Sequence, residues 1–363
     1  MKQVQFLNLI DGDILISGID GTVEGGRLLA PVCLKADEAP VVNGIAAKPD
    51  GNVFEAVVPL ECGANEIKAV LSGGEEAVIR VWWLKGAEKK YRFTVDDCIR
   101  CFEDITAHQD TYKSIFENPY LAVYKEAHDK YGSRVHINCF FESVDGKFNL
   151  SMMTDKFRDE FRANADWLTL TFHAQGEFPD APYKNASYET VAADCAKCVK
   201  EIERFAGKEV LRETTTLHWG AANAEGVRAL HDAGYKALCG YLCFDSKGEP
   251  LVSYHFNKEQ TAHAERREGW VDFDMGVLFA KLDFVLNDPA YTADRVAPYL
   301  DGLYKIPHEG QFIQMVIHEQ YFYADYHVYE PDYADRILNM AKWMHEHGYQ
   351  SVSLTELVNG NID

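Results

Sequence analysis

The feature that most constrains the fold is a change of pattern near residue 88. Before it, short apolar or β-branched runs alternate with dipeptides that favour tight turns, such as Asp11-Gly12 and Gly73-Gly74. After a polar segment, Lys85–Lys90, apolar runs of strand length alternate with amphipathic stretches of helix length. The chain is therefore predicted to contain two domains, residues 1–88 and residues 89–363.

Residues 1–88 are predicted to form a small all-β, immunoglobulin-like sandwich. Such a domain could bind carbohydrate, with Trp82 and Trp83 as stacking platforms, or mediate oligomerisation. We favour the alternative in which one tryptophan fills the sandwich core and the other packs on the next domain. The candidate strands are Ile14–Ile19, Leu28–Leu34, Val53–Leu60, Glu66–Leu71 and Ala77–Leu84.

Residues 89–363 are predicted to form a mainly parallel α/β domain, because strands and helices alternate along the chain. The predicted strands are Tyr91–Val95, Val135–Phe141, Trp167–Phe172, Val210–Leu217, Tyr235–Cys239, Gly276–Leu286, Phe312–His318 and Tyr349–Leu354. The predicted helices are 105–131, Lys156–Ala163, Tyr188–Phe205, Ala224–Ala233 and Asp332–His347.

Composition excludes several classes of partner. Lys and Arg total 36 against 57 Asp and Glu, a formal net charge of −21. Such a surface repels phosphate backbones and anionic lipid, so neither nucleic acid nor a membrane is an expected partner. No apolar run is long enough to span a bilayer, and the start of the chain lacks the apolar region of a signal peptide, so a cytoplasmic protein is expected. Nine cysteines, an odd number, suit a reducing compartment.

Polar side chains follow three of the predicted strands. Asp96 and Asp97 end the first strand of the second domain, His173 and Glu177 follow Trp167–Phe172, and His318 ends another strand. Because the carboxyl ends of parallel barrel strands converge on one face, we expect these side chains to meet. Side chains alternate along a strand, so Asp96 and Asp97 can enter one pocket only if the backbone bends between them.

These motifs resemble those of the polysaccharide deacetylase family, carbohydrate esterases of the family-four type. Residues 94–98, TVDDC, are similar to the family's Thr-Phe-Asp-Asp-Gly, and residues 135–142, VHINCFFE, to its Ala-Thr-Phe-Phe strand. Residues 173–179, HAQGEFP, resemble His-Thr-x-x-His-Pro, with Glu177 in place of the second histidine. The segment VIHEQ, which contains His318, resembles the family's Leu-x-x-His motif.

A third family motif, Arg-Pro-Pro-Tyr or Trp followed by Gly, is matched only from its aromatic residue onward, by Trp219 and Gly220. Thr216 stands at the arginine position, so the group that orients the catalytic aspartate in the family is missing. His218 either compensates for this loss or adds a metal ligand. The chain thus resembles a divergent member of the family over roughly residues 91–357.

The resemblance implies an irregular (β/α) barrel and a metal-dependent enzyme that removes acetyl groups from an N- or O-acetylated carbohydrate or a related small amide. Asp96 would be the general base, His318 the general acid, and the backbone N–H of Trp219 would hold the oxyanion. The alternative is a non-catalytic carbohydrate-binding protein built on a decayed deacetylase barrel. The implied ligands of a divalent metal, zinc or another divalent ion, are Asp97, His173 and Glu177, with His218 as an additional candidate.

Two further groups of residues have more than one interpretation. The pairs Cys98/Cys101 and Cys195/Cys198 could bind structural zinc, but the second pair lies within a predicted helix, so buried core positions are favoured. The tyrosines near the chain's last quarter could line a sugar cleft or close the barrel end, and neither interpretation is preferred. They are Tyr321, Tyr323, Tyr326, Tyr329 and Tyr333.

Overall fold

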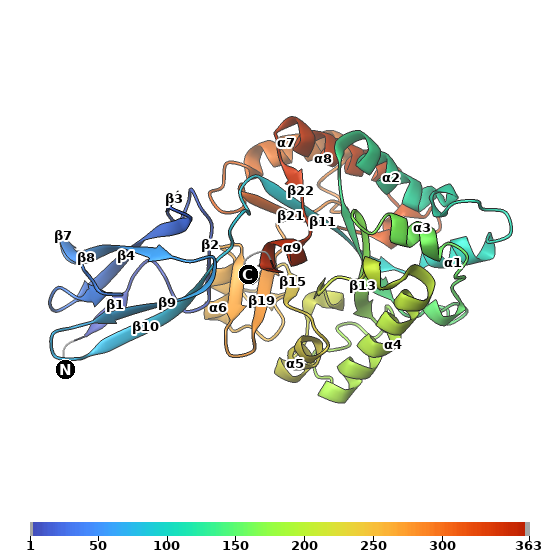
Figure 1. Cartoon of the computed structure of the whole chain (residues 1–363). Helices are drawn as coiled ribbons and strands as arrows, with labels where there is room; N and C mark the ends of the chain where they lie inside the picture. Colours follow the sequence, from blue (N-terminus) through green and yellow to red (C-terminus); the bar gives the residue numbers. More distant parts are fainter. Residues whose placement is uncertain (1–2, 360–363) are drawn as a thin grey trace.

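The structure is a computed structural model that describes residues 3–359, so the outermost residues of both predicted domains, 1–2 and 360–363, lie outside the described residues. Every element from Val4 to Trp83 is a strand, and these strands project to one side of the molecule (Figure 1). One antiparallel sheet contains β1 (Val4–Phe6), β3 (Thr22–Glu24), β4 (Arg27–Ala36), β7 (Lys48–Asp50) and β8 (Val53–Leu60). A second sheet contains β2 (Asp13–Leu15), β5 (Val41–Val42), β6 (Ile45–Ala46), β9 (Gly63–Val70) and β10 (Glu76–Trp83).

The N-terminal strands enclose an apolar core of their own. Alternate residues of β4 and β8 are buried, as expected for strands with one face turned inward. Their side chains share a core with those of β9 and β10, and Trp83 lies fully buried in it. Trp82 instead packs against an apolar cluster that includes Val271 and Leu278 of the second half of the chain. The favoured interpretation of the two tryptophans is therefore confirmed, whereas the immunoglobulin-like assignment stays a prediction.

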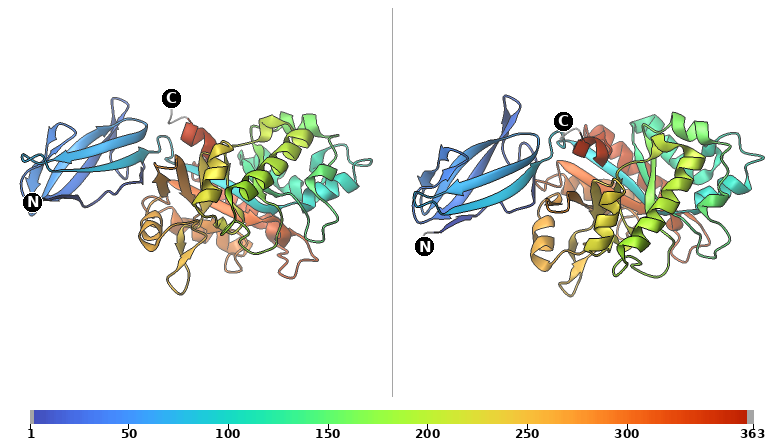
Figure 2. Two further views of the ribbon diagram at one scale, coloured as in Figure 1. Left: turned by 90° about the horizontal axis from the view of Figure 1, so that it is seen from below. Right: turned by 60° about the horizontal axis from the view of Figure 1, so that its bottom comes forward.

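The second N-terminal sheet continues into the rest of the molecule. Strand β18 (Gly269–Asp272) lies antiparallel to β2, with Trp270 opposite Asp13. Asp20 also crosses this boundary, because its carboxylate meets Arg267 at 2.5 Å and His308 at 2.9 Å. Figure 2 shows the N-terminal strands and the remaining chain side by side in two further views. The two predicted domains are thus joined by a shared ladder as well as by ion pairs.

The centre of the second half is a parallel sheet in the order β13-β12-β11-β21-β20, with β22 beside the start of β11. Nearly every residue of its long strands is buried, which explains why apolar residues occupy both faces of these segments instead of alternating with exposed polar ones. The members are β11 (Lys90–Cys98), β12 (Val135–Phe140), β13 (Leu168–Ala174), β20 (Phe284–Val285), β21 (Phe312–His318) and β22 (Gln350–Ser351).

The predicted barrel does not close into one sheet among the described residues. The parallel strands β14 (Thr214–Thr215), β15 (Ala237–Gly240) and β19 (Val277–Lys281) belong to the sheet that contains β18, and a single bridge, Leu170 to Leu211, joins the two groups. The predicted strand Val210–Leu217 is wrong in length, since only two of its residues join a ladder. The prediction of one strand over Gly276–Leu286 is also wrong, because the chain passes there from β19 in one sheet to β20 in the other.

Helices cover the outside of the parallel strands, with α2 beside α8 and α8 beside α7 (Figure 1). The predicted helix 105–131 is interrupted, because Pro119 begins a new helix and the Asn118 side chain accepts a hydrogen bond from the backbone N–H of Leu121. No helix among residues 3–359 is long and apolar enough to cross a membrane. The helices are α1 (Arg100–Ala107), α2 (Pro119–Tyr131), α3 (Arg158–Ala163), α4 (Tyr188–Ala206), α5 (Ala224–Asp232), α6 (Lys258–Ala264), α7 (Ala293–Leu303), α8 (Tyr333–Glu346) and α9 (Leu354–Asn359). The hairpin β16 (Cys243–Phe244) and β17 (Pro250–Leu251) completes the list of strands.

Candidate active site

A cavity of about 520 Å³ lies at the carboxyl ends of the parallel strands. All seven side chains singled out in the sequence line it, from the ends of β11, β13 and β21 and from the segments that follow β13 and β14. They are Asp96, Asp97, His173, Glu177, His218, Trp219 and His318. The expected convergence of strand ends is therefore present, although the strands do not form one closed sheet.

The end of β11 has the backbone bend that two adjacent aspartates in one cavity require. The pairing register between β11 and β12 shifts between Val95 and Cys98, and Asp97 has a left-handed φ of +64°. Asp96 still pairs in register with His318 of β21. Both carboxylates are buried, Asp96 at 4% exposure and Asp97 at 6%, and both line the cavity.

Asp97, His173 and His218 form a compact group. Oδ1 of Asp97 lies 3.0 Å from Nε2 of His173 and 3.1 Å from Nδ1 of His218, and the two nitrogens are 3.2 Å apart. All three side chains are buried. Among residues 3–359, this is the group of His, Cys, Asp and Glu side chains whose ligand atoms all lie within 4.8 Å of one another.

The hydrogen bonds on the far side of each imidazole define which nitrogen faces Asp97 with a lone pair. Nδ1 of His173 donates to the carbonyl oxygen of Thr216 at 2.5 Å, and Nε2 of His218 donates to the carbonyl oxygen of Glu177 at 3.1 Å, because carbonyl oxygens only accept. In the neutral rings, the remaining nitrogens are acceptors that face each other and the Asp97 carboxylate. Three acceptors at this spacing repel unless a proton or a cation lies between them, so the donor set suits a divalent metal ion.

The charges around this group favour an added positive charge. Burial acts to raise the pKa of Asp97, but the two imidazoles and His318 hold that pKa well below its usual value. Burial acts to lower the pKa of His173, but the carboxylates of Asp96 and Asp97 raise it above its usual value. A metal ion would compete with a proton for this position.

Glu177 lies outside the three-residue group, although the family motif places a metal ligand there. Its carboxylate lines the same cavity, and burial together with the charge of Asp97 raises its pKa. Its backbone carbonyl holds the ring of His218. The geometry therefore places His218, the additional candidate, in the three-residue group and leaves the side chain of Glu177 at the cavity wall.

The remaining predicted site residues are held by partners that the sequence analysis missed. Asn138 of β12 donates to Oδ1 of Asp96 at 2.5 Å, so an amide contacts this aspartate where the family uses arginine. Asn287 accepts from the backbone N–H of His318 at 3.0 Å and lies 2.9 Å from its Nδ1. Gln320 donates to Oδ2 of Asp97 at 2.7 Å. A fully buried polar residue inside the apolar strand VHINCF was the signal that could have identified Asn138.

Trp219 lies at the cavity rim, in a sharp turn between β14 and α5. Its φ of +63° is rare for a residue with a side chain, and the next residue, Gly220, also has a positive φ, of +48°. The indole is 50% exposed, so it does not fill the core. This turn places Trp219 and Gly220 in the cavity wall.

The two other groups singled out in the sequence resolve differently. Cys98, Cys101, Cys195 and Cys198 are buried free thiols whose pKa values burial raises, and none belongs to the ligand group described above, so their core interpretation is confirmed. The tyrosines divide between both interpretations. Tyr321 and Tyr326 line the cavity, whereas Tyr333 is buried among Tyr120 and Tyr124.

No family model and no curated protein matches this chain. Several solved structures do. A family 4 acetyl xylan esterase from Clostridium thermocellum, in complex with a cobalt ion, is 15% identical over 74% of this chain and 90% of that chain, with a TM-score of 0.38. A putative polysaccharide deacetylase from Mycobacterium smegmatis is 11% identical over 72% and 85%, with a TM-score of 0.43. A CE4 family pseudoenzyme from Bacillus anthracis is 10% identical over 86% and 88%, with a TM-score of 0.37. At these identities and scores, the likenesses establish neither family nor activity.

Proposed function

We propose that this protein is a metal-dependent hydrolase that removes acetyl groups from an N- or O-acetylated carbohydrate. The observation that carries the proposal is the convergence of three acceptor atoms, from Asp97, His173 and His218, within 4.8 Å of one another. They lie in a cavity that also contains a second carboxylate, Asp96, and a second imidazole, His318. Metal-dependent hydrolysis of an acetyl group requires a cation site, a general base and a general acid close to one another.

Asp97, His173 and His218 are the residues that would hold the metal, with Gln320 and the carbonyls of Thr216 and Glu177 fixing their orientation. When bound, a divalent metal ion there supplies Lewis-acid polarisation of the acetyl carbonyl and a lower pKa for water. An Asp-His-His set suits zinc, cobalt and other divalent ions, so zinc is one choice among several.

The other side chains of the cavity handle protons. Asp96, oriented by Asn138, takes a proton from the water whose oxygen attacks the acetyl carbon. The backbone N–H of Trp219 stabilises the negative charge that develops on the carbonyl oxygen. His318, oriented by Asn287, gives a proton to the departing sugar nitrogen or oxygen as its bond to the acetyl carbon breaks. The products are acetate and a free sugar amine or hydroxyl.

The shape and lining of the cavity support a sugar substrate. Its volume of about 520 Å³ falls in the range of roughly 300–1,000 Å³ typical of small-molecule sites. Trp219 at the rim and Tyr321 and Tyr326 within the wall offer flat apolar faces with polar edges. The acetyl specificity follows from the motif resemblance of residues 94–98 and 216–220.

The fold part of the proposal is an irregular deacetylase barrel preceded by an immunoglobulin-like domain. The order β20-β21-β11-β12-β13 in one sheet and β14-β15-β19 in the other supports the barrel, because consecutive parallel strands are neighbours. Two facing N-terminal sheets with a shared core support the second assignment.

A second candidate function is carbohydrate binding without turnover. It is favoured by Thr216, which stands where the resembled motif has arginine and whose buried hydroxyl has no hydrogen-bond partner among the described residues. Loss of the group that orients the base would leave a site that recognises acetylated sugar but does not hydrolyse it.

The decisive experiment measures acetate release from a panel of N- and O-acetylated sugars by protein loaded with zinc, cobalt or manganese. Wild type is expected to release acetate, and Asp97→Asn to lose more than about 1,000-fold in kcat/KM, because it removes a ligand of the cation. Glu203→Gln, an exposed change on α4, is the matched control. Metal-loaded wild type that binds the sugars but releases no acetate, with binding retained in Asp96→Asn, would establish the second candidate instead.

A further inference from the structure

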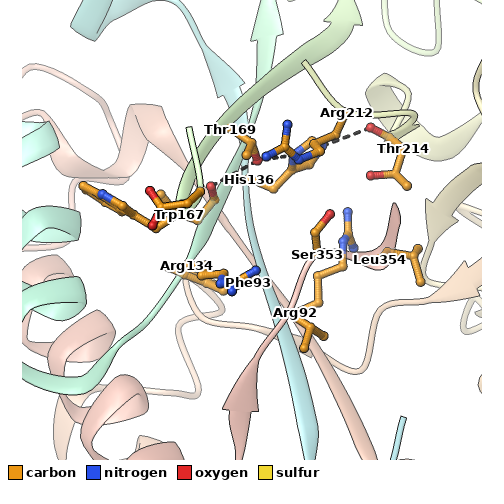
Figure 3. A pocket seen from close by; sticks show the side chains of 13 residues that line it. Arg92, Phe93, Arg134, His136, Trp167, Thr169, Arg212, Thr214, Ser353 and Leu354 are labelled. Carbon is orange, nitrogen blue, oxygen red and sulfur yellow. Dashed lines mark hydrogen bonds between the residues drawn. The ribbon is translucent and has the colours of Figure 1, made fainter. Parts of the chain in front are cut away.

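The opposite end of the same strands holds a second polar cavity, lined by the amino ends of β12, β13 and β14 and by the early part of β11 (Figure 3). Three guanidinium groups surround it, those of Arg92, Arg134 and Arg212. The proposed hydrolase chemistry makes no use of this cavity. Its volume is only about 20 Å³, close to the roughly 10–15 Å³ that a single water molecule requires.

Arg92 is the unusual member of this group. Its side chain is 2% exposed, and neither Nη1 nor Nη2 has a hydrogen-bond partner among residues 3–359. No carboxylate of the described chain forms an ion pair with it, whereas Arg134 is paired with Glu356 at 2.8 Å. A buried guanidinium without a counter-charge is strongly unfavourable, so a native fold that retains one supplies a partner for it.

The neighbours of Arg92 add positive charge and cannot neutralise it. Arg212 donates to the carbonyl oxygens of Glu209, Leu211 and Ala165, which hold its guanidinium beside the cavity without cancelling its charge. Asp166 also lines the cavity but is exposed to solvent at its rim. Arg92 and Arg212 thus bring two guanidinium charges to the cavity, whereas the nearby carboxylates of Asp166 and Glu356 belong to exposed residues.

His136 forms one wall and stays uncharged. Its Nε2 donates to the carbonyl oxygen of Thr214 at 3.0 Å, so Nδ1, 2.8 Å from the hydroxyl of Thr169, accepts. Burial and the charge of Arg92 lower its pKa to about 3. Both ring nitrogens are thus occupied, and the imidazole neither accepts a hydrogen bond from Arg92 nor adds charge near neutral pH.

We propose that this cavity binds one small monovalent anion of the size of chloride, held by the terminal nitrogens of Arg92 in the field of Arg212 and Arg134. The volume accepts one such ion and is too small for phosphate, sulfate or a carboxylate-bearing metabolite. Val352, Ser353 and Leu354 also line the cavity, so the anion would tie the C-terminal segment to the strands that carry the catalytic groups at their other ends.

The test compares thermal unfolding of the full chain in sodium chloride and in sodium gluconate at equal ionic strength, because gluconate is too large for the cavity. Wild type is expected to gain about 3 °C in Tm at chloride concentrations well above the dissociation constant. Arg92→Met, which keeps the volume and removes the charge, is expected to lose this gain and to be no less stable than wild type in gluconate. Arg228→Met, a change of an exposed arginine on α5, is the matched control and is expected to keep the gain.

A second measurement keeps the proposal testable if Arg92→Met does not fold. Crystals of wild type grown in sodium bromide are expected to show an anomalous peak between Arg92 and Arg212. An equal Tm of wild type in both salts, a chloride gain retained by Arg92→Met, or bromide crystals with ordinary water density at this position would each overturn the proposal.

Discussion

The two ends of strand β11 present opposite chemistry. At its carboxyl end, acceptor atoms of Asp97, His173 and His218 face one another. Near its start, Arg92 lines a cavity, and its terminal nitrogens have no hydrogen-bond partner among the described residues. Arg92 and Asp96 are only four positions apart, a distance of about 13 Å along a strand. Burial is nearly equal at the two ends. The proposed cation site and the proposed anion site thus differ in whether lone pairs or N–H groups converge on the cavity.

The largest effect is expected when the two candidates for the third metal ligand, His218 and Glu177, are substituted one at a time. His218→Ala is expected to weaken zinc binding by about 1,000-fold or more, because it removes a nitrogen of the three-acceptor group. Glu177→Gln, the matched variant at the position the sequence motif favours, is expected to change the affinity by less than about 10-fold. Competition with a chromophoric chelator measures both. The opposite ranking would show that the sequence motif, and not the acceptor geometry, identifies the ligand.

The next largest effect is expected at Asn287, which contacts His318 and would act by orienting its imidazole. Asn287→Ala removes the oxygen beside Nδ1 of His318 and is expected to lower kcat by about 10- to 100-fold with little change in KM, because the imidazole loses its orientation. Asn287→Asp keeps an acceptor in place and is expected to retain most of the activity. Steady-state kinetics of both variants would expose a purely structural role, for which the two substitutions would be equally harmful.

The smallest expected effect concerns His136, at the amino ends of the parallel strands. It is a dependence of the free energy of unfolding on pH. His136 has a folded pKa of about 3, so between the ordinary histidine value and pH 3 the unfolded chain binds a proton that the folded chain does not. Stability is therefore lost as the pH falls, by about 1.5 kcal/mol between pH 6.5 and pH 5 from this group.

Urea unfolding of wild type and His136→Gln at pH 6.5 and pH 5 measures this contribution. The two proteins are compared by how much their free energy of unfolding changes between these pH values. The variant is expected to lose less stability on acidification, whatever its stability at neutral pH. His231→Gln, at a half-exposed position on α5, provides the comparison that should follow wild type. An equal change in the free energy of unfolding with pH for all three proteins would mean that His136 is not held neutral by its surroundings.

The sequence alone predicted the strand ends that meet at the cavity, because Asp96, His173 and His318 each follow a mainly apolar run of strand length. It did not rank His218 above Glu177, since the choice depends on a turn with positive φ at Trp219. Asn138 and Arg92 lie inside buried strands and were passed over. A polar residue within an apolar run shows that a partner must exist, but the partner comes from a different strand, and the register between strands is set by tertiary packing.

Local signals were also weaker wherever two sheets compete for one segment. Gly276–Leu286 is mostly apolar, and its two charged residues, Lys281 and Asp283, do not show that the chain leaves one ladder after Lys281 and joins another at Phe284. The break at Asn118 and Pro119, by contrast, is a helix start that the residues themselves encode.

The ladder between β2 and β18 bears on whether the N-terminal region can be removed or exchanged without disturbing the rest of the protein. A module that is attached only by a linker can be exchanged or lost without disturbing its neighbour. Here, removal of residues 1–88 would deprive β18 of one of its two neighbouring strands, leaving it paired with β19 alone, and would leave Arg267 and His308 without Asp20. An exposed strand edge can pair with strands of other chains, so the shortened protein is expected to aggregate more readily. The N-terminal strands are thus a structural part of the α/β half and not a separable attachment.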